Sequence, residues 1–389
     1  MSKALDEKWE VRSTLDVSYE IRIAADLLNP ENPTLLELPD GGIGSGERVV
    51  VLDHNLVGSY GSRIDAYFRA RAVPHRTVVV SGGEQNKTMG QVFQIVSALN
   101  NAGTLRVGNP PIAIGGGVAL DIVGLAASLY RRGIPHTRVP TTLLSLVDVS
   151  VAAKTGVNFQ GYRNRIGSYS PPPLTLVDLS FLGTVPQRQI SNGAGEMLKL
   201  GLIKDATLFE LLEAGGPDLV NSRFQHSQTA RHAIGLAIAD MIEELRDNLW
   251  EKDLRRVVDY GHSFSPLVEM RHVHDLLHGE AVTLDCIFSA VIALRRGHLG
   301  HADLQRILDT ARGLRLPVWH SAFGDAALLW QALSDTVRHR NGSQNLPLMA
   351  GIGRSLFIND LTFDEVATTV EHMRHLATES LRLDAVVAP

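Results

Sequence analysis

Five polar side chains in the middle of this sequence are of the types that perform acid–base and metal chemistry. Glu196 and Lys199 are three residues apart, so on a helix both project from one face. Lys154 lies in an otherwise uncharged stretch that we expect to be buried. One carboxylate with the imidazoles of His262 and His278 suits a divalent, zinc-like ion that keeps coordination positions open for substrate oxygens.

Each of these residues also has a plain structural interpretation. An exposed ion pair would explain Glu196 and Lys199 on their own. His272 and His274 compete with His278 as ligands, and we favour His278 because it begins an apolar helix that can face a cleft. The spacing of these groups is irregular, so the metal site is a hypothesis that needs further support.

A glycine-rich turn provides a second chemical signal. Gly115, Gly116 and Gly117 follow the apolar stretch 111–114 and precede a small-residue helical stretch, 122–129. Three glycines let the backbone approach a pyrophosphate closely, and a helix N-terminus offers free N–H groups. A plain strand–helix turn is the alternative. The glycine-rich run 41–46 precedes its strand, and we interpret it as a flexible loop.

Basic residues among small ones indicate an anionic substrate. Arg131 and Arg132 lie at a turn before an apolar strand, and the run 163–165 (Arg-Asn-Arg) follows a glycine. Such groups suit a phosphate. A solvated charged loop is the alternative, and it is more credible for Arg131 and Arg165 than for Lys154.

The elements that must position these residues change in character along the chain. In the first half, strands alternate with helices, which predicts a parallel, doubly wound, Rossmann-like α/β sheet with ligands at the carboxyl ends of its strands. The strands are expected at 19–24, 48–52, 77–80, 111–114 and 136–139.

The second half is expected to be mostly helical. The predicted helices cover 195–203, 206–213, 230–249, 278–298 and 363–380, and two strands cover 346–352 and 355–358. Ser191 or Asn192 is the expected cap of the first helix. We therefore predict an α/β domain over residues 1–185 and an α-helical domain over 186–389, with the site in the cleft between them.

Composition limits the class of protein. The 389 residues are 20% charged and 44% hydrophobic, and the formal net charge of −5 argues against a general nucleic-acid or anionic-membrane binder. Cys286 is the single cysteine, so no intrachain disulfide can form and a reducing compartment is expected. The charged N-terminus lacks a signal-peptide core, and no apolar run has membrane length, which predicts a cytoplasmic location.

With these residues and motifs, the chain resembles the sugar phosphate cyclases, the family that includes 3-dehydroquinate synthase. The resemblance runs from about residue 45 to about residue 360. Seven segments carry it: 83–87 (GEQNK), 115–121 (GGGVALD), 140–144 (PTTLL), 154–158 (KTGVN), 192–199 (NGAGEMLK), 261–264 (GHSF) and 278–282 (HGEAV).

The resemblance implies a homodimer with bound NAD and a divalent metal, zinc or cobalt, held by Glu196, His262 and His278. The NAD contacts that it implies are Asp53, Asn55, Glu84, Lys87, Gly115, Gly116, Gly117, Asp121, Thr141, Thr142 and Asp148, with Phe181 and Thr184 nearby. The implied substrate and phosphate contacts are Arg132, Lys154, Arg163, Asn164, Lys199 and Arg255.

Four departures from 3-dehydroquinate synthases bear on the substrate. Pro266 replaces a histidine, and Asp259 replaces an asparagine. The pair 339–340 (His-Arg) replaces two lysines, and Leu245 stands in place of a third. These changes remove attraction for a substrate carboxylate, and an aspartate adds repulsion. We therefore expect a phosphorylated substrate without a carboxylate, whose hydroxyls bind Asp259 and His339.

This pattern is similar to that of the sedoheptulose 7-phosphate cyclases, in particular the 2-epi-5-epi-valiolone synthases. It implies a phosphate-eliminating lyase that makes a cyclitol for natural-product biosynthesis. The implied steps are transient oxidation by NAD, elimination, reduction, ring opening and intramolecular aldol closure. The alternatives are a 2-epi-valiolone synthase, a gadusol-type cyclase, a 3-dehydroquinate synthase, a polyol dehydrogenase that releases NADH, and a non-catalytic relative that binds NAD or sugar phosphate.

Overall fold

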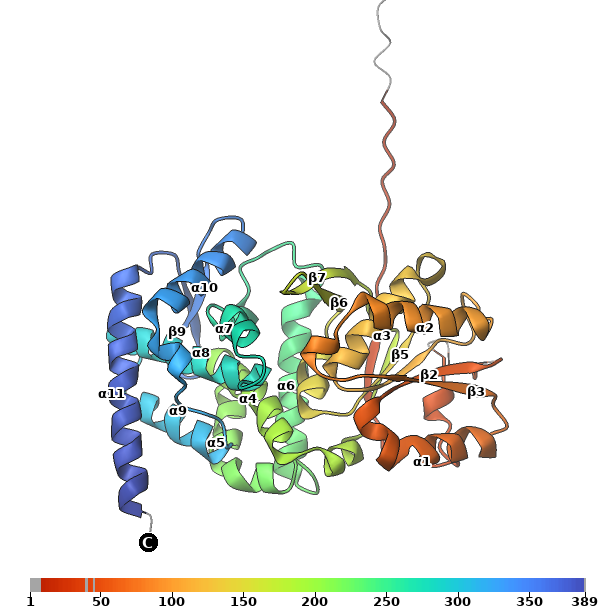
Figure 1. Ribbon diagram of the computed structural model, residues 1–389, viewed down its shortest axis with the longest axis horizontal. Coiled ribbons are helices and arrows are strands. Elements are labelled where there is room, and N and C mark those ends of the chain that lie inside the picture. The colour runs from red at the N-terminus through yellow and green to blue at the C-terminus, as the bar shows by residue number, and fades with distance from the viewer. Residues whose placement is uncertain (1–7, 39–40, 45, 388–389) are drawn as a thin grey trace, which may run out of the picture.

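The computed structural model describes residues 8–387, except 39–40 and 45, and places an α/β half beside a helical half (Figure 1). A six-stranded sheet forms the first half, in the order β1-β8-β5-β4-β2-β3, and its neighbouring strands are parallel. The strands are β1 (Glu20–Ile23), β2 (Arg48–Asp53), β3 (His75–Val80), β4 (Ile112–Gly115), β5 (Thr137–Pro140) and β8 (Leu174–Val177). The predicted parallel, doubly wound sheet is confirmed.

Helices cover both faces of this sheet because its central strands are apolar on both sides. The helices are α1 (Val57–Ala70), α2 (Met89–Asn101) and α3 (Gly117–Leu129). Val49 and Val51 of β2 belong to the apolar core that includes α2 and α3, whereas Val50 and Leu52 belong to the core that includes α1. Alternate residues of one strand therefore bury against opposite layers, as a doubly wound sheet requires.

A β-hairpin that the sequence analysis did not predict adds to this half. Its strands, β6 (Lys154–Phe159) and β7 (Tyr162–Tyr169), are antiparallel, and Gln160 and Gly161 between them have positive φ, as a two-residue hairpin turn demands. The hairpin packs against α3. The side chain of Lys154 is 51% exposed, so the expectation that it is buried is wrong.

The second half contains eight helices and one small antiparallel sheet among the described residues. The helices are α4 (Gln187–Ile203), α5 (Ala206–Asn221), α6 (Gln228–Arg246), α7 (Ser265–Arg271), α8 (His278–Arg295), α9 (His301–Gly313), α10 (Ala326–His339) and α11 (Phe363–Val387). The strands are β9 (Leu346–Met349) and β10 (Ser355–Ile358). The predicted helical character of this half is confirmed.

Helix α4 begins earlier than the sequence analysis expected. Pro186 precedes its first residue, Gln187, so Ser191 and Asn192 lie inside the helix and the prediction that one of them caps it is wrong. One apolar core joins the helices to segments 143–151 and 177–185 of the first half. The domain boundary near residue 185 stays a prediction. Among the described residues, the helices are too short or too polar to cross a membrane.

Candidate active site

The crossing of α4 and α8 brings a carboxylate and a histidine together. Two glycines make the close approach necessary for this: a Cβ at Gly279 would lie 1.8 Å from the carbonyl oxygen of Asn192, and one at Gly195 would lie 2.4 Å from the carbonyl oxygen of Gly279. Asn192 Oδ1 accepts a hydrogen bond of 2.6 Å from the Gly279 N–H. Any side chain at either glycine would push the helices apart and separate Glu196 from His278.

Glu196, His262 and His278 form a compact cluster of potential ligand atoms. Glu196 Oε1 lies 3.2 Å from His278 Nε2 and 3.8 Å from His262 Nε2, and the three ligand atoms lie within 4.8 Å of one another. Ligand atoms of a tetrahedral zinc site are about 3.3 Å apart, given bonds of about 2.0–2.2 Å. Glu196 Oε1 is buried and makes no hydrogen bond. The donor set and its spacing therefore fit a divalent metal ion.

Both histidines have their second ring nitrogen next to an oxygen. Nδ1 of His262 is 3.2 Å from the Tyr260 carbonyl oxygen, and Nδ1 of His278 is 2.9 Å from Glu269 Oε2. A proton on each Nδ1 leaves each Nε2 lone pair facing Glu196. Metal-binding histidines characteristically have such an oxygen partner. Gly261, with φ of +76°, makes the turn that aims His262, and a Cβ there would lie 2.7 Å from Cys286 Sγ.

Lys199 forms a buried ion pair with the cluster. Its Nζ is 2.6 Å from Glu196 Oε2, and the two side chains are 3% and 2% exposed, which rules out an exposed surface pair. Burial by itself would raise the pKa of Glu196, but Lys199 and the two histidines hold it well below its usual value. Burial would lower the pKa of Lys199, and Glu196 and Asp148 raise it instead. Lys199 therefore keeps its proton and is a charged hydrogen-bond donor beside the cluster.

Glu269 is a site residue that the sequence analysis missed. It lies on α7, one turn after Pro266, which occupies the first turn of that helix. Besides His278, Glu269 Oε2 contacts Arg163 Nη1 at 2.7 Å, and the Nε of the same guanidinium is 3.3 Å from Glu84. Arg163 therefore connects the α/β half to a carboxylate that orients a candidate metal ligand. A glutamate on a seven-residue helix gave no sequence signal of this role.

The glycine turn lies at the carboxyl edge of the parallel sheet, where the sequence placed it. Asp53 ends β2, Gly115 ends β4 and Thr141 follows β5. A Cβ at Gly115 would lie 2.8 Å from the Ala119 side chain and 3.0 Å from that of Asp53, so the turn tolerates only glycine. Gly116 caps α3 without a side-chain hydrogen bond. The N–H groups of the first turn of α3 can therefore bind an anion such as a pyrophosphate.

Lys87 connects helix α3, which follows the glycine turn, to the hairpin of β6 and β7. Its side chain is 3% exposed, and its Nζ lies 2.5 Å from Asp121 of α3 and 2.6 Å from Asn164 Oδ1 of β7. Asn158 Nδ2 donates to Glu84 Oε1 at 3.0 Å. The structure thus brings together four residues that the resemblance assigned to NAD or phosphate, from segments far apart in the sequence.

The remaining residues expected to contact NAD border the same edge. Asn55 donates to Asp53 Oδ1 at 3.0 Å, and Thr142 bonds with Ser145 at 2.9 Å. Asp148 lies near Glu196, and its burial together with that charge raises its pKa. Phe181 is 1% exposed and packs 4.9 Å from the Tyr60 ring, and Thr184 Oγ1 is 3.2 Å from the Tyr60 hydroxyl.

Asp259 is already neutralised by two arginines. Its carboxylate pairs with Arg256, and its Oδ2 lies 3.0 Å from Arg340, which is 5% exposed. Arg256 also pairs with Glu251, whose Oε1 is 2.7 Å from Lys154 Nζ. The five side chains form a line of alternating charge between the hairpin and the helical half. The two guanidinium groups therefore offset the repulsion that we expected Asp259 to add toward a substrate carboxylate, and the role of Asp259 in binding substrate hydroxyls stays a prediction.

Three other predicted substrate residues lie outside this network. Arg255 is exposed and lies 4.6 Å above the Phe357 ring, and His339 is exposed at the last residue of α10. Arg132 is exposed in a turn with φ of +66°. Leu245 is buried in the helical core. The substrate roles of Arg132, Arg255 and His339 stay predictions.

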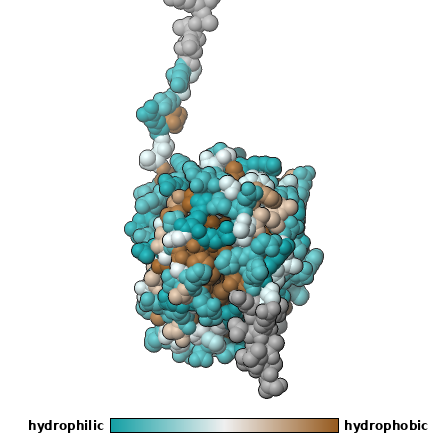
Figure 2. All heavy atoms as spheres, turned by 90° about the vertical axis from the view of Figure 1, so that its left-hand side faces the viewer, coloured by the Kyte–Doolittle hydropathy of each residue, from teal (hydrophilic) through white to brown (hydrophobic). Residues whose placement is uncertain are grey.

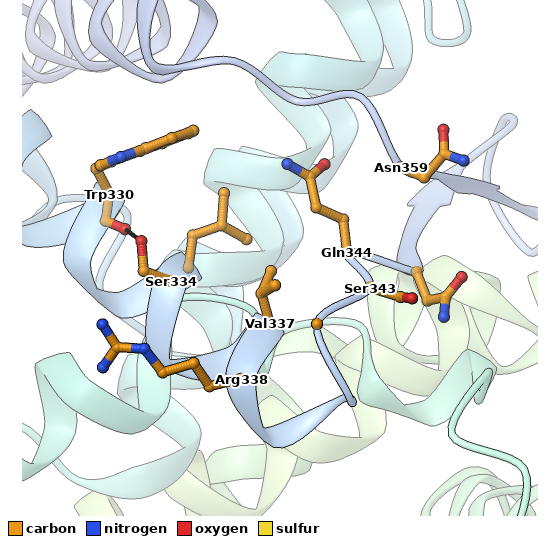
Figure 3. A pocket seen from close by; sticks show the side chains of 10 residues that line it. Trp330, Ser334, Val337, Arg338, Ser343, Gln344 and Asn359 are labelled. Carbon is orange, nitrogen blue, oxygen red and sulfur yellow. Dashed lines mark hydrogen bonds between the residues drawn. The ribbon is translucent and has the colours of Figure 1, made fainter.

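Two hollows border the helical half. One of about 250 Å³ lies between the loop after β3, the hairpin turn and α7, and its lining includes Glu84, Asn158 and Met270. A second, of about 640 Å³, lies between α10 and the loop that follows it, where Trp330, Arg338 and Gln344 line it (Figure 3). None of the predicted site residues lines the second hollow. The first is therefore the one that adjoins the candidate site.

Comparisons with known proteins find similarity over nearly the whole chain. Sequence profiles of the 3-dehydroquinate synthase N-terminal and C-terminal regions match residues 77–192 and 193–337. A 2-epi-5-epi-valiolone synthase of Actinoplanes sp. is 46% identical over 97% of this chain and 96% of its own length. A demethyl-4-deoxygadusol synthase of Trichormus variabilis is 31% identical over 97% of this chain and 92% of its own.

A solved structure shows the same fold. It is ValA, a 2-epi-5-epi-valiolone synthase from Streptomyces hygroscopicus subsp. jinggangensis, with NAD+ and Zn2+ bound. The TM-score is 0.90 at 44% identity, and the match covers 94% of this chain and 99% of that one.

Proposed function

This chain belongs to the 3-dehydroquinate synthase family of sugar phosphate cyclases, and from that premise we propose that it converts sedoheptulose 7-phosphate to 2-epi-5-epi-valiolone and phosphate. The proposal rests on the similarity to 2-epi-5-epi-valiolone synthases over nearly the whole chain, together with the buried Glu196–His262–His278 cluster. The reaction class is a carbon–oxygen lyase that yields a cyclitol for natural-product biosynthesis. The lone, buried Cys286 supports a cytoplasmic location, and the family supports a homodimer.

We propose that Glu196, His262 and His278 hold zinc or cobalt and that the glycine turn of α3 holds the pyrophosphate of NAD. The fit rests on the unpartnered Glu196 Oε1, the two Nε2 atoms that face it and the uncapped N-terminus of α3. Bound there, the metal would supply Lewis acidity to substrate oxygens, and NAD would supply reversible hydride transfer.

The side chains of the protein would bind and orient the sugar phosphate. Lys199 keeps its proton beside Glu196 and can donate a hydrogen bond to a substrate oxygen near the metal site. The amide of Asn164 and the guanidinium of Arg163 lie on β7, where they contact Lys87 and Glu269, and would bind the phosphate. Lys154 Nζ would exchange Glu251 for the phosphate, because it is the exposed cation of that pair.

Product analysis tests the reaction. We expect the protein, supplied with NAD and zinc or cobalt, to release phosphate from sedoheptulose 7-phosphate without build-up of NADH. A parallel reaction with the carboxylated heptulosonate phosphate should release none. NMR coupling constants of the product then identify the epimer. Release from the carboxylated substrate alone would identify a 3-dehydroquinate synthase, and accumulation of NADH would identify a polyol dehydrogenase.

Replacing Glu269 by glutamine tests how the metal site is supported. The change removes the charge that orients His278 and that pairs with Arg163, and we expect metal affinity to fall roughly 10–100-fold. Competition with a chelator measures this without reference to turnover. Glu244→Gln is the matched control, because in the described part of the chain Glu244 of α6 pairs with Lys204, the residue that follows α4. Equal metal affinity in the two variants would show that Glu269 has no such role.

A further inference from the structure

A buried carboxylate in the middle of α8 has no part in the reaction proposed above. Hydrophilic residues cover much of the helical end of the molecule (Figure 2), whereas residues 279–293 of α8 are all buried. Asp285 is one of them, and its side chain is completely inaccessible to solvent. Burying a carboxylate costs free energy unless hydrogen bonds replace the water that it loses. The hydrogen-bond partners of Asp285 therefore indicate its role.

These partners are backbone N–H groups at the start of α7. Asp285 Oδ2 accepts hydrogen bonds of 2.6 Å from Phe264 and 2.8 Å from Ser265, both of which are buried. The side chain of Phe264 has no polar atom with which to cap the helix, and Pro266 has no N–H. A carboxylate from α8 thus caps α7 in place of a local residue. Burial raises the pKa of Asp285 to about 6, and the N–H groups oppose that rise because they favour the charged form.

The capped segment directly follows the turn that carries His262. Tyr260 fixes the other end of this turn on the same helix, because its hydroxyl donates to the Cys286 carbonyl oxygen at 2.8 Å. Between these two ends, a Cβ at Gly261 would lie 2.9 Å from the Val282 side chain, so the turn lies directly against α8. His262 is therefore held between two hydrogen-bonded contacts with one helix.

Helix α8 also carries the second histidine of the cluster. His278 is its first residue, and Val282 and Asp285 follow by four and seven residues, so the three share one face of the helix. This face supplies His278 directly and receives the turn of His262 two helical turns further on. The helix that Asp285 caps, α7, carries Glu269, whose Oε2 is 2.9 Å from His278 Nδ1. One carboxylate thus fixes a segment on which both histidines depend.

We propose that Asp285 is a positioning residue that sets the relative placement of the two histidines of the metal site. This inference rests on the metal site proposed above. Without the carboxylate, two buried N–H groups would lack an acceptor, and the start of α7 would have to move to bring them to water. His262 Nε2, which is 3.8 Å from Glu196 Oε1, would move with the turn.

Metal affinity tests this role. Asp285→Ala removes the acceptor of both N–H groups, and we expect competition with a chelator to show a loss of zinc affinity of roughly tenfold or more. Ser289→Ala is the matched control, because Ser289 lies one turn further along α8 and donates to the other oxygen of Asp285 at 3.3 Å. Its zinc affinity should equal that of the parent protein. Unchanged affinity in Asp285→Ala, or equal losses in the two variants, would overturn the proposal.

A core variant separates positioning from a general loss of stability. Leu99 of α2 is fully buried in the apolar core that α2 and α3 share, so Leu99→Ala leaves a cavity in the α/β half. We expect it to lower the melting temperature and to keep the zinc affinity of the parent protein. If Leu99→Ala loses as much zinc affinity as Asp285→Ala, instability explains both and the proposal is wrong.

Hydrogen exchange, followed by NMR on metal-free protein, tests the hydrogen bonds themselves. Asp285→Asn replaces the charged acceptor by a neutral one and serves here even if Asp285→Ala does not fold. We expect the amides of Phe264 and Ser265 to exchange roughly fivefold faster or more in this variant, while those of residues 287–293 stay protected. Equal exchange in variant and parent would contradict the proposal.

The outcomes distinguish this role from the metal site itself. A parent protein that binds no zinc would refute the metal site and the role of Asp285 together. A parent that binds zinc, with Asp285 variants that bind it equally well, would refute the role of Asp285 alone.

Discussion

Glu196→Gln should abolish both turnover and metal retention. Its Oε1 is the buried, unpartnered oxygen between the two histidine Nε2 atoms, so the variant lacks the anionic ligand of the cluster. Metal Lewis acidity contributes several kcal/mol to transition-state stabilisation, and its loss should lower kcat by roughly a thousandfold or more. Metal content by atomic spectroscopy and phosphate release are the two measurements.

A second variant separates loss of metal from loss of fold. Glu196→Gln also leaves the ammonium of Lys199 buried without its partner, which can cost about 3–5 kcal/mol of stability. His262→Ala keeps that ion pair and removes a ligand, and it should lose metal while its thermal unfolding stays cooperative. Full activity of either variant without metal would contradict the metal assignment.

The fold could be predicted from sequence where pattern and position coincide. The apolar strands at 48–52 and 111–114, each followed by a helix and the second also by three glycines, indicate a parallel sheet and the edge where ligands bind. The hairpin of β6 and β7 could not be predicted in the same way. It alternates weakly, because Lys154, Asn158 and the polar residues of β7 face solvent or the site rather than a core.

The sequence could predict which residues form the site, but not the hydrogen-bond partners that hold those residues in place. Resemblance named Glu196, His262 and His278, and the structure brings them together. It does not predict that a buried carboxylate on the short helix α7 completes the hydrogen bonding of His278. Such a contact depends on how α7 packs against α8, which no local pattern encodes.

Adjacent basic side chains, Arg255 with Arg256 and His339 with Arg340, show the limit of sequence reasoning most clearly. The sequence singled out Arg255 and His339, but the neighbours Arg256 and Arg340 are the residues that pair with Asp259. In irregular segments and at helix ends, consecutive side chains point in different directions, so the motif fixes the region and the backbone decides which residue enters the site. Of the departures from 3-dehydroquinate synthases, Asp259 and Arg340 therefore belong to one network of ion pairs.

The ion-pair network around Asp259 should also affect which substrate the protein prefers. Asp259→Asn should shift selectivity toward the carboxylated heptulosonate phosphate by roughly tenfold or more in the ratio of kcat/KM values. In the protein, Asp259 cancels one of the two guanidinium charges beside it, and Arg340 is almost fully buried. Without the carboxylate, Arg256 keeps Glu251 but Arg340 loses its ion-pair partner, so the network gains one net positive charge, which favours an additional anion on the substrate. Breaking a buried pair should also lower the melting temperature.

A double variant shows whether the excess positive charge or a local loss of structure causes the change in substrate selectivity of Asp259→Asn. Asp259→Asn with Arg340→Met removes one charge of each sign, so it should return selectivity toward that of the parent chain even if stability stays low. Asp253→Asn is the control, since Asp253 is exposed and its carboxylate accepts a hydrogen bond from the Arg255 N–H. If the single and double variants share one selectivity, the charge balance at Asp259 does not set it. The preference must then come from another property of the pocket, such as its shape, because removing the excess positive charge would have left it unchanged.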